Sequence, residues 1–464
     1  MSCIATLLSL AACSGGGQVT PPDGTSAPSQ GSQTTGEAPT TAKPVTLVDP
    51  WARTYGGNED DAFSAVVIAD NGDIIAAGTT SSVEGDFAGT HGPDNLDALL
   101  ARFTPTGDLV WAHTYGGSDD DYFASVAIAD NGDIIVAGYT YSLDGDFPSA
   151  NGQDKRDAVI ARYDPTGDVN IWTHILGGTG DDYFREAKVA DNGEIIVIGF
   201  TNSTDGDFPS THEQGDGVIV RFAGFGNIIW AHAFSDGNIN SLSSLALAGN
   251  GDIIIAGATQ PTEGGSGTTH GGADALITRF TSTGDVIWTH NYGGNTTDYF
   301  SIVALADNGD IVITGYTNST DGDFPSIHGD TNHDAVVGRF TSTGDIIWVH
   351  TLGGNSYDLF TSGTIADNGD IIATGNTLSS EGDFITHGSS DALIARFTGS
   401  GDLLWAKVCG GGSYDTFMSV AVADDGDIVA VGYTKSPDGD FPATHGEDNQ
   451  DALVARFTEA GSLT

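Results

Sequence analysis

A chain of 464 residues with 63 acidic and only 15 basic side chains carries a formal net charge of −48 at neutral pH. This charge excludes nucleic acid as a partner, because a phosphate backbone is bound by clustered lysine and arginine. The 66 glycines and the short apolar runs rich in valine and isoleucine favour many short strands joined by tight turns over helices.

The first segment, residues 1–12, predicts export. It is short and apolar and ends in Leu10-Ala11-Ala12, directly before Cys13. The pattern resembles the lipobox of bacterial lipoproteins, in which a signal peptide is cut before a cysteine that is then acylated. No lysine or arginine precedes the apolar stretch, which departs from a secretory signal. The resemblance implies lipidation at Cys13 and a location at the bacterial cell envelope, on the outer membrane or the cell surface.

The next segment, residues 13–45, is rich in glycine, serine, threonine, proline and glutamine. Such a composition buries too little apolar surface to offset the entropy lost on ordering, so a disordered tether is predicted. Cys3 and Cys13 lie in the signal segment or at its edge, which leaves Cys409 as the only thiol beyond it. We expect Cys409 to be a small buried apolar residue.

From residue 46 to residue 464 the sequence repeats about every 60 residues. An arginine in the pattern Asp-(Ala/Gly)-x-x-x-Arg-(Phe/Tyr) recurs once per repeat, as does a turn such as Asp130-Asn131-Gly132-Asp133. The tryptophans recur in the same register, at Trp51, Trp111, Trp172, Trp230, Trp288, Trp348 and Trp405.

The second repeat illustrates the predicted strands. Four segments have the apolar patterns of strands: residues 123–129, 133–140, 157–163 and 169–176. Glycine-containing turns or a longer loop separate them. Four antiparallel strands in each of seven repeats predict an all-β fold, a single seven-bladed β-propeller.

The two ends of the repeat region predict how the ring closes. Residues 461–464 align with residues 107–110, which stop one position before a tryptophan, and Trp51 has no preceding blade. We therefore expect residues 46–56 to supply the outermost strand of the last blade. Closure of this kind leaves no unpaired seam between the first and the last blade.

The repeated pattern Trp-x-x-x-x-Gly-Gly, Asp-x-Phe, Asp-Asn-Gly-Asp-Ile, Gly-Tyr-Thr-x-Ser and Asp-Phe-Pro resembles the SBBP class of bacterial β-propeller repeats. The resemblance covers residues 46–464 and implies the fold and an envelope location, but no single activity. The element Thr106-Gly107-Asp108-Leu109-Val110-Trp111 is also similar to the tryptophan motif of quinoprotein propellers, where it packs blades together.

Positions that recur in every blade are interpreted as structural. They include the tryptophans, the arginines and the aspartates that begin the third strands. We expect the aspartates to bond loop amides and the arginines to pair with carboxylates on a neighbouring strand. Histidines recur in two blade-periodic sets: His113, His174, His232, His290 and His350 on outer strands, and His91, His212, His270, His328, His387 and His445 in loops. Neither set indicates catalysis or metal binding.

The loops after the second and fourth strands open on one face of the disc, and we expect that face to be the acidic one. Hard oxygen ligands suit Ca²⁺, which takes roughly six to eight oxygens. The same aspartates are typical of Asx turns, and no loop has a full EF-hand ligand set, so both interpretations stay open. The candidate calcium ligands are Asp121, Asp144, Asp146, Asp205, Asp207, Asp321, Asp323, Asp438 and Asp440.

The fourth repeat departs from the others, with Asn240 in place of the first-strand aspartate and residues 263–267 in place of Asp-Gly-Asp-Phe. Two interpretations are open: a degenerate blade, or the footprint of a partner. Lys155 and Arg156 form the only adjacent basic pair in a loop after a second strand. No asymmetric cluster of titratable groups is evident, which argues against an enzyme.

The sequence thus predicts a non-enzymatic binding or scaffold propeller that displays an acidic loop face to a protein, a glycan or a cation. We expect the partner to be a protein or polysaccharide at the cell surface, and contact with the membrane only through the lipid anchor. The alternative is a secreted hydrolase or lyase that uses the central channel. Fold alone does not choose between these functions.

Overall fold

The computed structural model describes residues 48–87, 89, 95–148, 155–208, 215–235, 238–261, 270–324, 332–441, 445 and 449–463. The predicted signal peptide, Cys13 and the tether lie outside the described residues. The chain from Val45 to Thr464 forms one compact unit. None of the described segments is a helix long and apolar enough to cross a membrane.

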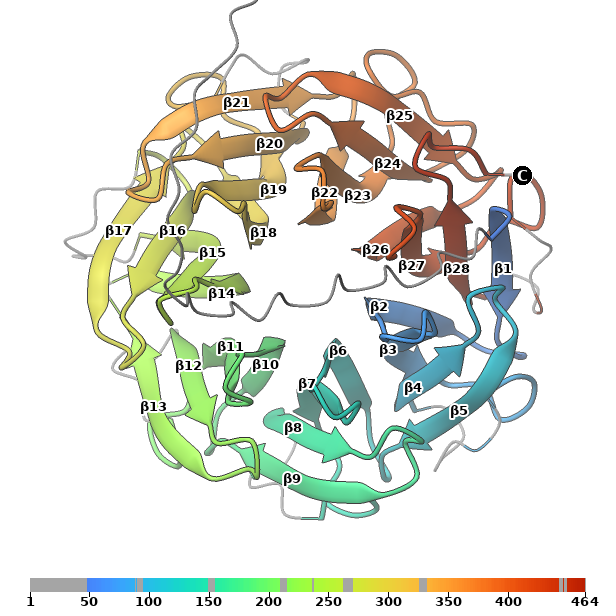
Figure 1. Ribbon diagram of the computed structural model, residues 1–464, viewed down its shortest axis with the longest axis vertical. Helices are drawn as coiled ribbons and strands as arrows, with labels where there is room; N and C mark the ends of the chain where they lie inside the picture. The colour runs from blue at the N-terminus through green and yellow to red at the C-terminus, as the bar shows by residue number, and fades with distance from the viewer. Residues whose placement is uncertain are drawn as a thin grey trace, which may run out of the picture. The chain divides into compact units, whose positions relative to one another are not determined.

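The unit from Val45 is a ring of seven four-stranded antiparallel sheets, as the sequence predicts (Figure 1). Blade 1 contains β2 (Asp61–Ile68), β3 (Ile74–Thr80), β4 (Asp97–Phe103) and β5 (Leu109–Tyr115). Blade 2 contains β6 (Asp121–Ile128), β7 (Ile134–Thr140), β8 (Asp157–Tyr163) and β9 (Asn170–Leu176). The strands of blade 2 match the predicted ranges to within two residues at each end.

Blade 3 contains β10 (Asp182–Val189), β11 (Ile195–Thr201), β12 (Asp216–Phe222) and β13 (Ile228–Phe234). Blade 4 contains β14 (Ile239–Leu247), β15 (Ile253–Gln260), β16 (Asp274–Phe280) and β17 (Val286–Tyr292). Blade 5 contains β18 (Asp298–Leu305), β19 (Ile311–Thr317), β20 (Asp334–Phe340) and β21 (Ile346–Leu352). Blade 6 contains β22 (Asp358–Ile365), β23 (Ile371–Thr377), β24 (Asp391–Phe397) and β25 (Leu403–Cys409).

Blade 7 joins the two ends of the propeller. It contains β26 (Asp415–Val422), β27 (Ile428–Thr434) and β28 (Asp451–Phe457), and its outermost strand is β1 (Trp51–Tyr55). β1 pairs antiparallel with β28, with Trp51 opposite Arg456 and Tyr55 opposite Ala452. The predicted closure by the N-terminal strand is therefore confirmed.

The hydrophobic core lies between neighbouring blades. The second and third strands are apolar on both faces and buried, because each lies between the sheets on either side. Phe63 and Phe103 of blade 1, for example, belong to one buried cluster with Val429 and Val454 of blade 7. Cys409 is a buried free thiol at the end of β25, as predicted.

Arginine and tryptophan side chains join each blade to the next. Arg339 bonds Asp310 of its own blade at 2.9 Å and donates to the carbonyl of Gly399 in the next blade, also at 2.9 Å. The Trp348 ring lies against Gly401 of the same neighbouring turn, where a Cβ atom would collide with the indole. These contacts are of the kind expected for residues with a structural role.

The innermost strand of each blade contains a β-bulge, which leaves one residue outside the ladder and turns its side chain toward the ring axis. These seven residues line the central channel: Ser64, Ala124, Arg185, Ser243, Ser301, Thr361 and Met418. The bulge therefore creates a set of equivalent channel positions whose side chains differ from blade to blade.

Candidate functional site

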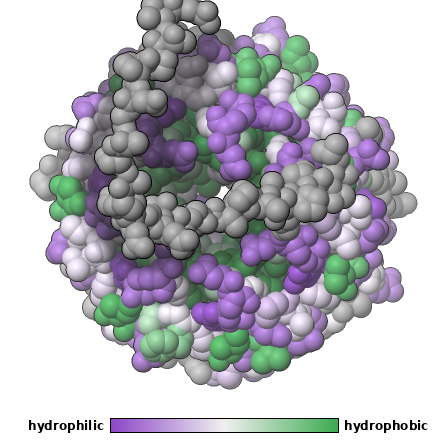
Figure 2. Space-filling view, viewed as in Figure 1, coloured by the Kyte–Doolittle hydropathy of each residue, from purple (hydrophilic) through white to green (hydrophobic). Residues whose placement is uncertain are grey.

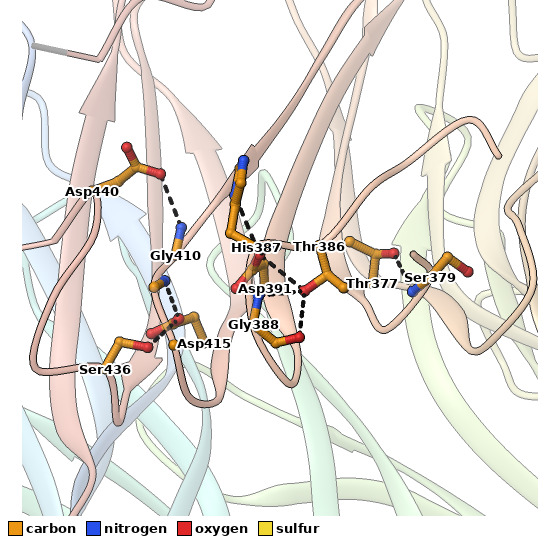
Figure 3. Close-up of polar contacts among 12 residues, drawn as sticks. Thr377, Ser379, Thr386, His387, Gly388, Asp391, Gly410, Asp415, Ser436 and Asp440 are labelled. Atoms are coloured by element: carbon orange, nitrogen blue, oxygen red, sulfur yellow. Dashed lines mark hydrogen bonds and ion pairs between the residues drawn. The ribbon is translucent and has the colours of Figure 1, made fainter. Parts of the chain in front are cut away.

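The loop face is the end of the propeller where the loops after the second and fourth strands meet, and the turn face is the opposite end. At the junction of blades 6 and 7, the buried carboxylate of Asp415 organises the loop face (Figure 3). Its Oδ2 accepts the amide of Gly411 at 2.9 Å and the hydroxyl of Ser436 at 2.7 Å. One carboxylate thus fixes the ends of two loops.

The same buried aspartate begins the inner strand of every blade except blade 4. Burial raises the pKa of the Asp121 carboxyl to about 7, although hydrogen bonds from Thr140, Ser142 and Gly117 oppose the shift. The members of the set are Asp61, Asp121, Asp182, Asp298, Asp358 and Asp415, with Asn240 at the equivalent position of blade 4. Burial raises the pKa of Asp61 and of Asp358 to about 6.

A second carboxylate, from the third strand of the preceding blade, faces each of these aspartates. Asp391 lies opposite Asp415 with Gly410 between them, and a Cβ atom on Gly410 would collide with both carboxylates. The Oδ2 atom of Asp391 accepts the amide of His387 (Figure 3). The third-strand aspartate thus accepts a loop amide, as the sequence predicts. The first glycine of the Gly-Gly sequence follows from the close carboxylate pair, whereas the second, Gly411, lies against the backbone and side chain of Asp438.

Eight of the nine candidate calcium ligands lie in exposed corners of the loop face. Asp144 Oδ1 accepts the amide of Ser118 at 2.8 Å, and Asp146 Oδ2 accepts the amide of Gly116 at 3.0 Å. Phe147, directly after the corner, is buried. Equivalent amide bonds fix Asp205 and Asp207, Asp321 and Asp323, and Asp438 and Asp440. The ninth candidate, Asp121, is one of the buried aspartates.

These contacts correspond to the turn-forming interpretation of the acidic corners. Among the residues that the structure describes, no three histidine, cysteine, aspartate or glutamate side chains are placed to hold a metal ion. Each corner carboxylate is exposed and uses one oxygen for a loop amide, so calcium would have to bind the remaining oxygens. Calcium binding at the corners stays a prediction.

The expectation that acidic side chains mark one face is wrong. The short turns of the turn face also carry exposed aspartates, which end or begin the strands there. They include Asp130, Asp191, Asp285, Asp307, Asp345, Asp367, Asp402 and Asp424. The physical reason is that the tight turns between strands also need side-chain acceptors: Asn131 Oδ1, for example, accepts the amide of Asp133 at 3.2 Å.

The periodic histidines and the basic pair take structural contacts. His113 Nε2 lies 3.1 Å from the carbonyl oxygen of Thr166 in the next blade, and His290 repeats this contact with Thr343. Lys155 and Arg156 both pair with Asp181. His91, His212, His328 and residues 263–267 lie outside the described residues.

The central channel contains a feature that the sequence analysis missed. The channel encloses about 810 Å³, and Figure 2 shows the molecule hollowed at the centre of the ring. Its bulge positions carry small or uncharged side chains, except in blade 3, where Arg185 stands and is exposed to the channel. A comparison of the seven inner strands would have found this signal, because Asp182–Val189 alone contains arginine, glutamate and lysine.

The groups around Arg185 are mainly hydroxyls. Burial raises the pKa of the Tyr299 phenol, but the charge of Arg185 and hydrogen bonds from Arg185 and serines outweigh it, so this pKa lies below its usual value. Tyr299 bonds the hydroxyl of Ser243, and Tyr122 bonds that of Ser64. The channel wall therefore combines these hydroxyls with the charged side chains Arg185, Glu186, Lys188, Asp191 and Arg221.

Comparisons with known proteins identify no family for this chain. No family model matches the chain, so the resemblance to SBBP repeats stays a prediction. Regulatory protein FlaEY of Caulobacter vibrioides is 25% identical over 423 residues, which cover 81% of this chain and 43% of that protein. The chain thus spans less than half the length of this curated relative.

Solved structures with 11% sequence identity have similar folds. The Pan2 WD40 domain of Neurospora crassa has a TM-score of 0.47, and the match covers 89% of this chain and 97% of that domain. The polysaccharide lyase Uly1 has a TM-score of 0.48, with 90% and 94% covered. These similarities concern the fold and carry no inference about activity.

The buried aspartates predict that stability falls as the pH rises. The pKa of Asp121 is about 7 in the folded protein, above its value of about 4 in an unfolded chain, so the folded state binds the proton more tightly. The stability contributed by this proton is complete below about pH 4 and is lost as the pH rises toward 7. Asp121→Asn should therefore raise the melting temperature at pH 8 by roughly 2 to 4 °C and have little effect at pH 5.

Asp130→Asn is the matched control, because it removes the same charge from an exposed turn of the same blade. Thermal melts of both variants at pH 5 and pH 8, at constant ionic strength, separate the buried carboxyl from general charge repulsion. Equal shifts for the two variants would assign the pH dependence to net charge. Asn240 in blade 4 indicates that the site accepts the amide side chain.

Proposed function

We propose that the protein is a non-enzymatic binding or scaffold propeller of the bacterial cell envelope, which presents the acidic corners of its loop face to a basic ligand or a cation. The observation that carries the proposal is the repetition of one rigid, exposed carboxylate pair around the ring. Four of the described pairs consist of two aspartates, Asp144 and Asp146, Asp205 and Asp207, Asp321 and Asp323, and Asp438 and Asp440, and two pair a glutamate with an aspartate, Glu84 with Asp86 and Glu381 with Asp383.

Rigidity matters because a fixed acceptor loses little entropy when it binds. In each corner with two aspartates, both are held by backbone amides, and the following phenylalanine is buried against the blade. The Phe147 ring, for example, packs edge-on against Phe123 with a centroid distance of 6.4 Å. Repetition of the corner favours a partner with several positive charges, since linked contacts raise the effective concentration of each further contact.

The acidic corners can be tested by neutralising them without removing their amide bonds. Asparagine keeps an oxygen acceptor but no charge, so a variant with all eight aspartates of the four two-aspartate corners changed to asparagine should keep its fold. We expect a lysine-rich peptide to bind the parent at low salt and to bind this variant at least about tenfold more weakly. The control variant changes Asp130, Asp191, Asp285, Asp307, Asp345, Asp367, Asp402 and Asp424 of the turn face to asparagine.

Equal weakening in the two variants would show that charge alone, and not the corner geometry, attracts the peptide.

The same proteins test calcium binding by thermal melting. If the corners bind Ca²⁺, millimolar calcium should stabilise the parent more than sodium at matched ionic strength, by about 2.7 kcal/mol at a hundredfold excess over Kd. The corner variant should lose this gain, and a parent whose melting does not respond to EDTA would remove calcium from the proposal.

The envelope location rests on the sequence pattern around Cys13. Replacing Cys13 with serine removes the acylation site and leaves the propeller unchanged, so this variant should move from the membrane fraction to the soluble fraction of fractionated cells. Cys409→Ser is the control thiol, since Cys409 is buried far along the chain in β25. If Cys13→Ser stays with the membranes, the lipidation proposal is wrong.

A second candidate is an enzyme that works in the central channel, and Tyr299 favours it. A phenol with a lowered pKa beside an arginine has the properties of a general base. Tyr299→Phe should then abolish turnover of a channel ligand and leave its binding nearly unchanged. Turnover that survives in Tyr299→Phe would count against this residue as the base.

A further inference from the structure

Arg185 differs from every other arginine in the part of the chain that the structure describes. Each of the other described arginines forms an ion pair with an aspartate or a glutamate. These arginines are Arg53, Arg102, Arg156, Arg162, Arg221, Arg279, Arg339, Arg396 and Arg456. No carboxylate of the described residues forms an ion pair with Arg185. In a chain with 63 acidic side chains and 15 basic ones, an arginine without such a pair needs an explanation.

The nearest acidic side chain on the same strand is engaged elsewhere. Glu186 Oε2 accepts the amide of Leu245 in the next blade at 2.6 Å, and Oε1 pairs with Lys188 at 2.8 Å. In other blades a serine hydroxyl accepts the equivalent amide bond from the next blade; Ser125 Oγ, for instance, accepts the amide of Ala187. Glu186 therefore has the structural role of that serine, and the Arg185 guanidinium has no anionic partner among the residues that the structure describes.

Hydroxyl side chains stand at four of the other six bulge positions, Ser64, Ser243, Ser301 and Thr361, and the apolar Ala124 and Met418 stand at the other two. The Tyr299 phenol bonds the Arg185 guanidinium. Hydroxyls can both donate and accept hydrogen bonds, so this wall suits a ligand that is itself rich in hydroxyls. The guanidinium adds a planar pair of donors that matches the geometry of a carboxylate.

The surrounding charge limits the ligand to a weakly charged anion. A net charge of −48 repels polyanions such as nucleotides. The other cations that line the channel, Lys188 and Arg221, already pair with Glu186 and Glu194. One free guanidinium therefore matches one negative charge at a time.

We propose that the central channel binds a sugar acid, with Arg185 holding its carboxylate and the serine, threonine and tyrosine hydroxyls bonding its hydroxyl groups. The volume of about 810 Å³ lies in the range of small-molecule sites and accommodates about one to three sugar units. This site is separate from the acidic corners, so it does not depend on the function proposed for them.

The test uses the full propeller and the methyl glycoside of galacturonate, which carries one negative charge, measured by titration calorimetry at a fixed, moderate ionic strength. The matched probe is the methyl ester of the same glycoside, which keeps every hydroxyl and masks the charge. We expect the acid to bind and the ester to bind at least about tenfold more weakly. Arg185→Ala should weaken binding of the acid by about tenfold or more, and Arg185→Lys by less, because lysine keeps the charge but not the planar donor pair.

Arg53→Ala is the control for loss of a positive charge, since Arg53 lies on the outer strand β1 and pairs with Asp108. It should bind the acid as the parent does. If Arg185→Ala melts early, Ser301→Ala, which alters the hydroxyl wall at another bulge and leaves Arg185 in place, should still weaken binding of the acid.

Three results would overturn the proposal: no binding of the acid, equal binding of acid and ester, or equal binding by the parent and a folded Arg185→Ala variant. Competition by inorganic sulfate at the concentration of the galacturonate probe would also overturn it, because the site would then recognise any anion. Weakened peptide binding by the corner variant bears on the acidic corners alone, so failures of the two proposals are distinguishable.

Discussion

The ring depends on a guanidinium that bonds two blades at once. Arg396 pairs with Asp370 in its own blade at 2.9 Å and donates to the Glu459 carbonyl of the next blade at 2.8 Å. Because the carboxylate and the carbonyl lie at fixed positions, this contact sets how one sheet stands against its neighbour. Buried phenylalanines and valines fill the space between the sheets, and the tryptophan closes its outer edge.

This contact explains why the fold could be predicted from the sequence. The arginine bonds a carbonyl of the next blade at six junctions, and Trp51 donates to the carbonyl of Pro105 at the junction of blades 7 and 1. The constraint is thus repeated along the chain, and its period counts the blades. The strand ranges followed from turns such as Asp130-Asn131-Gly132, whose glycine has a positive φ of 85°. The closure followed from Trp51, which packs on Gly107 of blade 1 as the other tryptophans do on their neighbours.

The candidate site was harder to predict, for two physical reasons. An aspartate that accepts a loop amide and one that binds calcium use the same oxygens, so the sequence of a corner such as Asp144 to Asp146 suits both. Arg185 was missed because the bulge breaks the simple alternation of a strand, and only the register shift between Phe184 and Glu186 shows that this side chain turns to the channel.

The extreme charge follows in large part from the turn chemistry of the blades. Each repeat uses aspartates to fix its loop corners, its Gly-Gly loop and its tight turns, and arginine neutralises only one of them per junction. The negative surface is therefore a consequence of building seven blades with the same acceptors. Both faces of the disc become acidic for the same reason, whatever the protein binds.

The outer strands give this charge a further consequence. β13, β17, β21 and β25 are sheet edges with unpaired backbone groups, and they expose apolar residues such as Ile229, Ile287 and Ile347. Strand edges of this kind can join the sheets of two molecules and start aggregation. Exposed aspartates, including Asp285 and Asp345, stand directly before these strands. Two molecules that approach edge to edge bring these like charges together, so the aspartates of the turns disfavour association between the outer strands of neighbouring propellers.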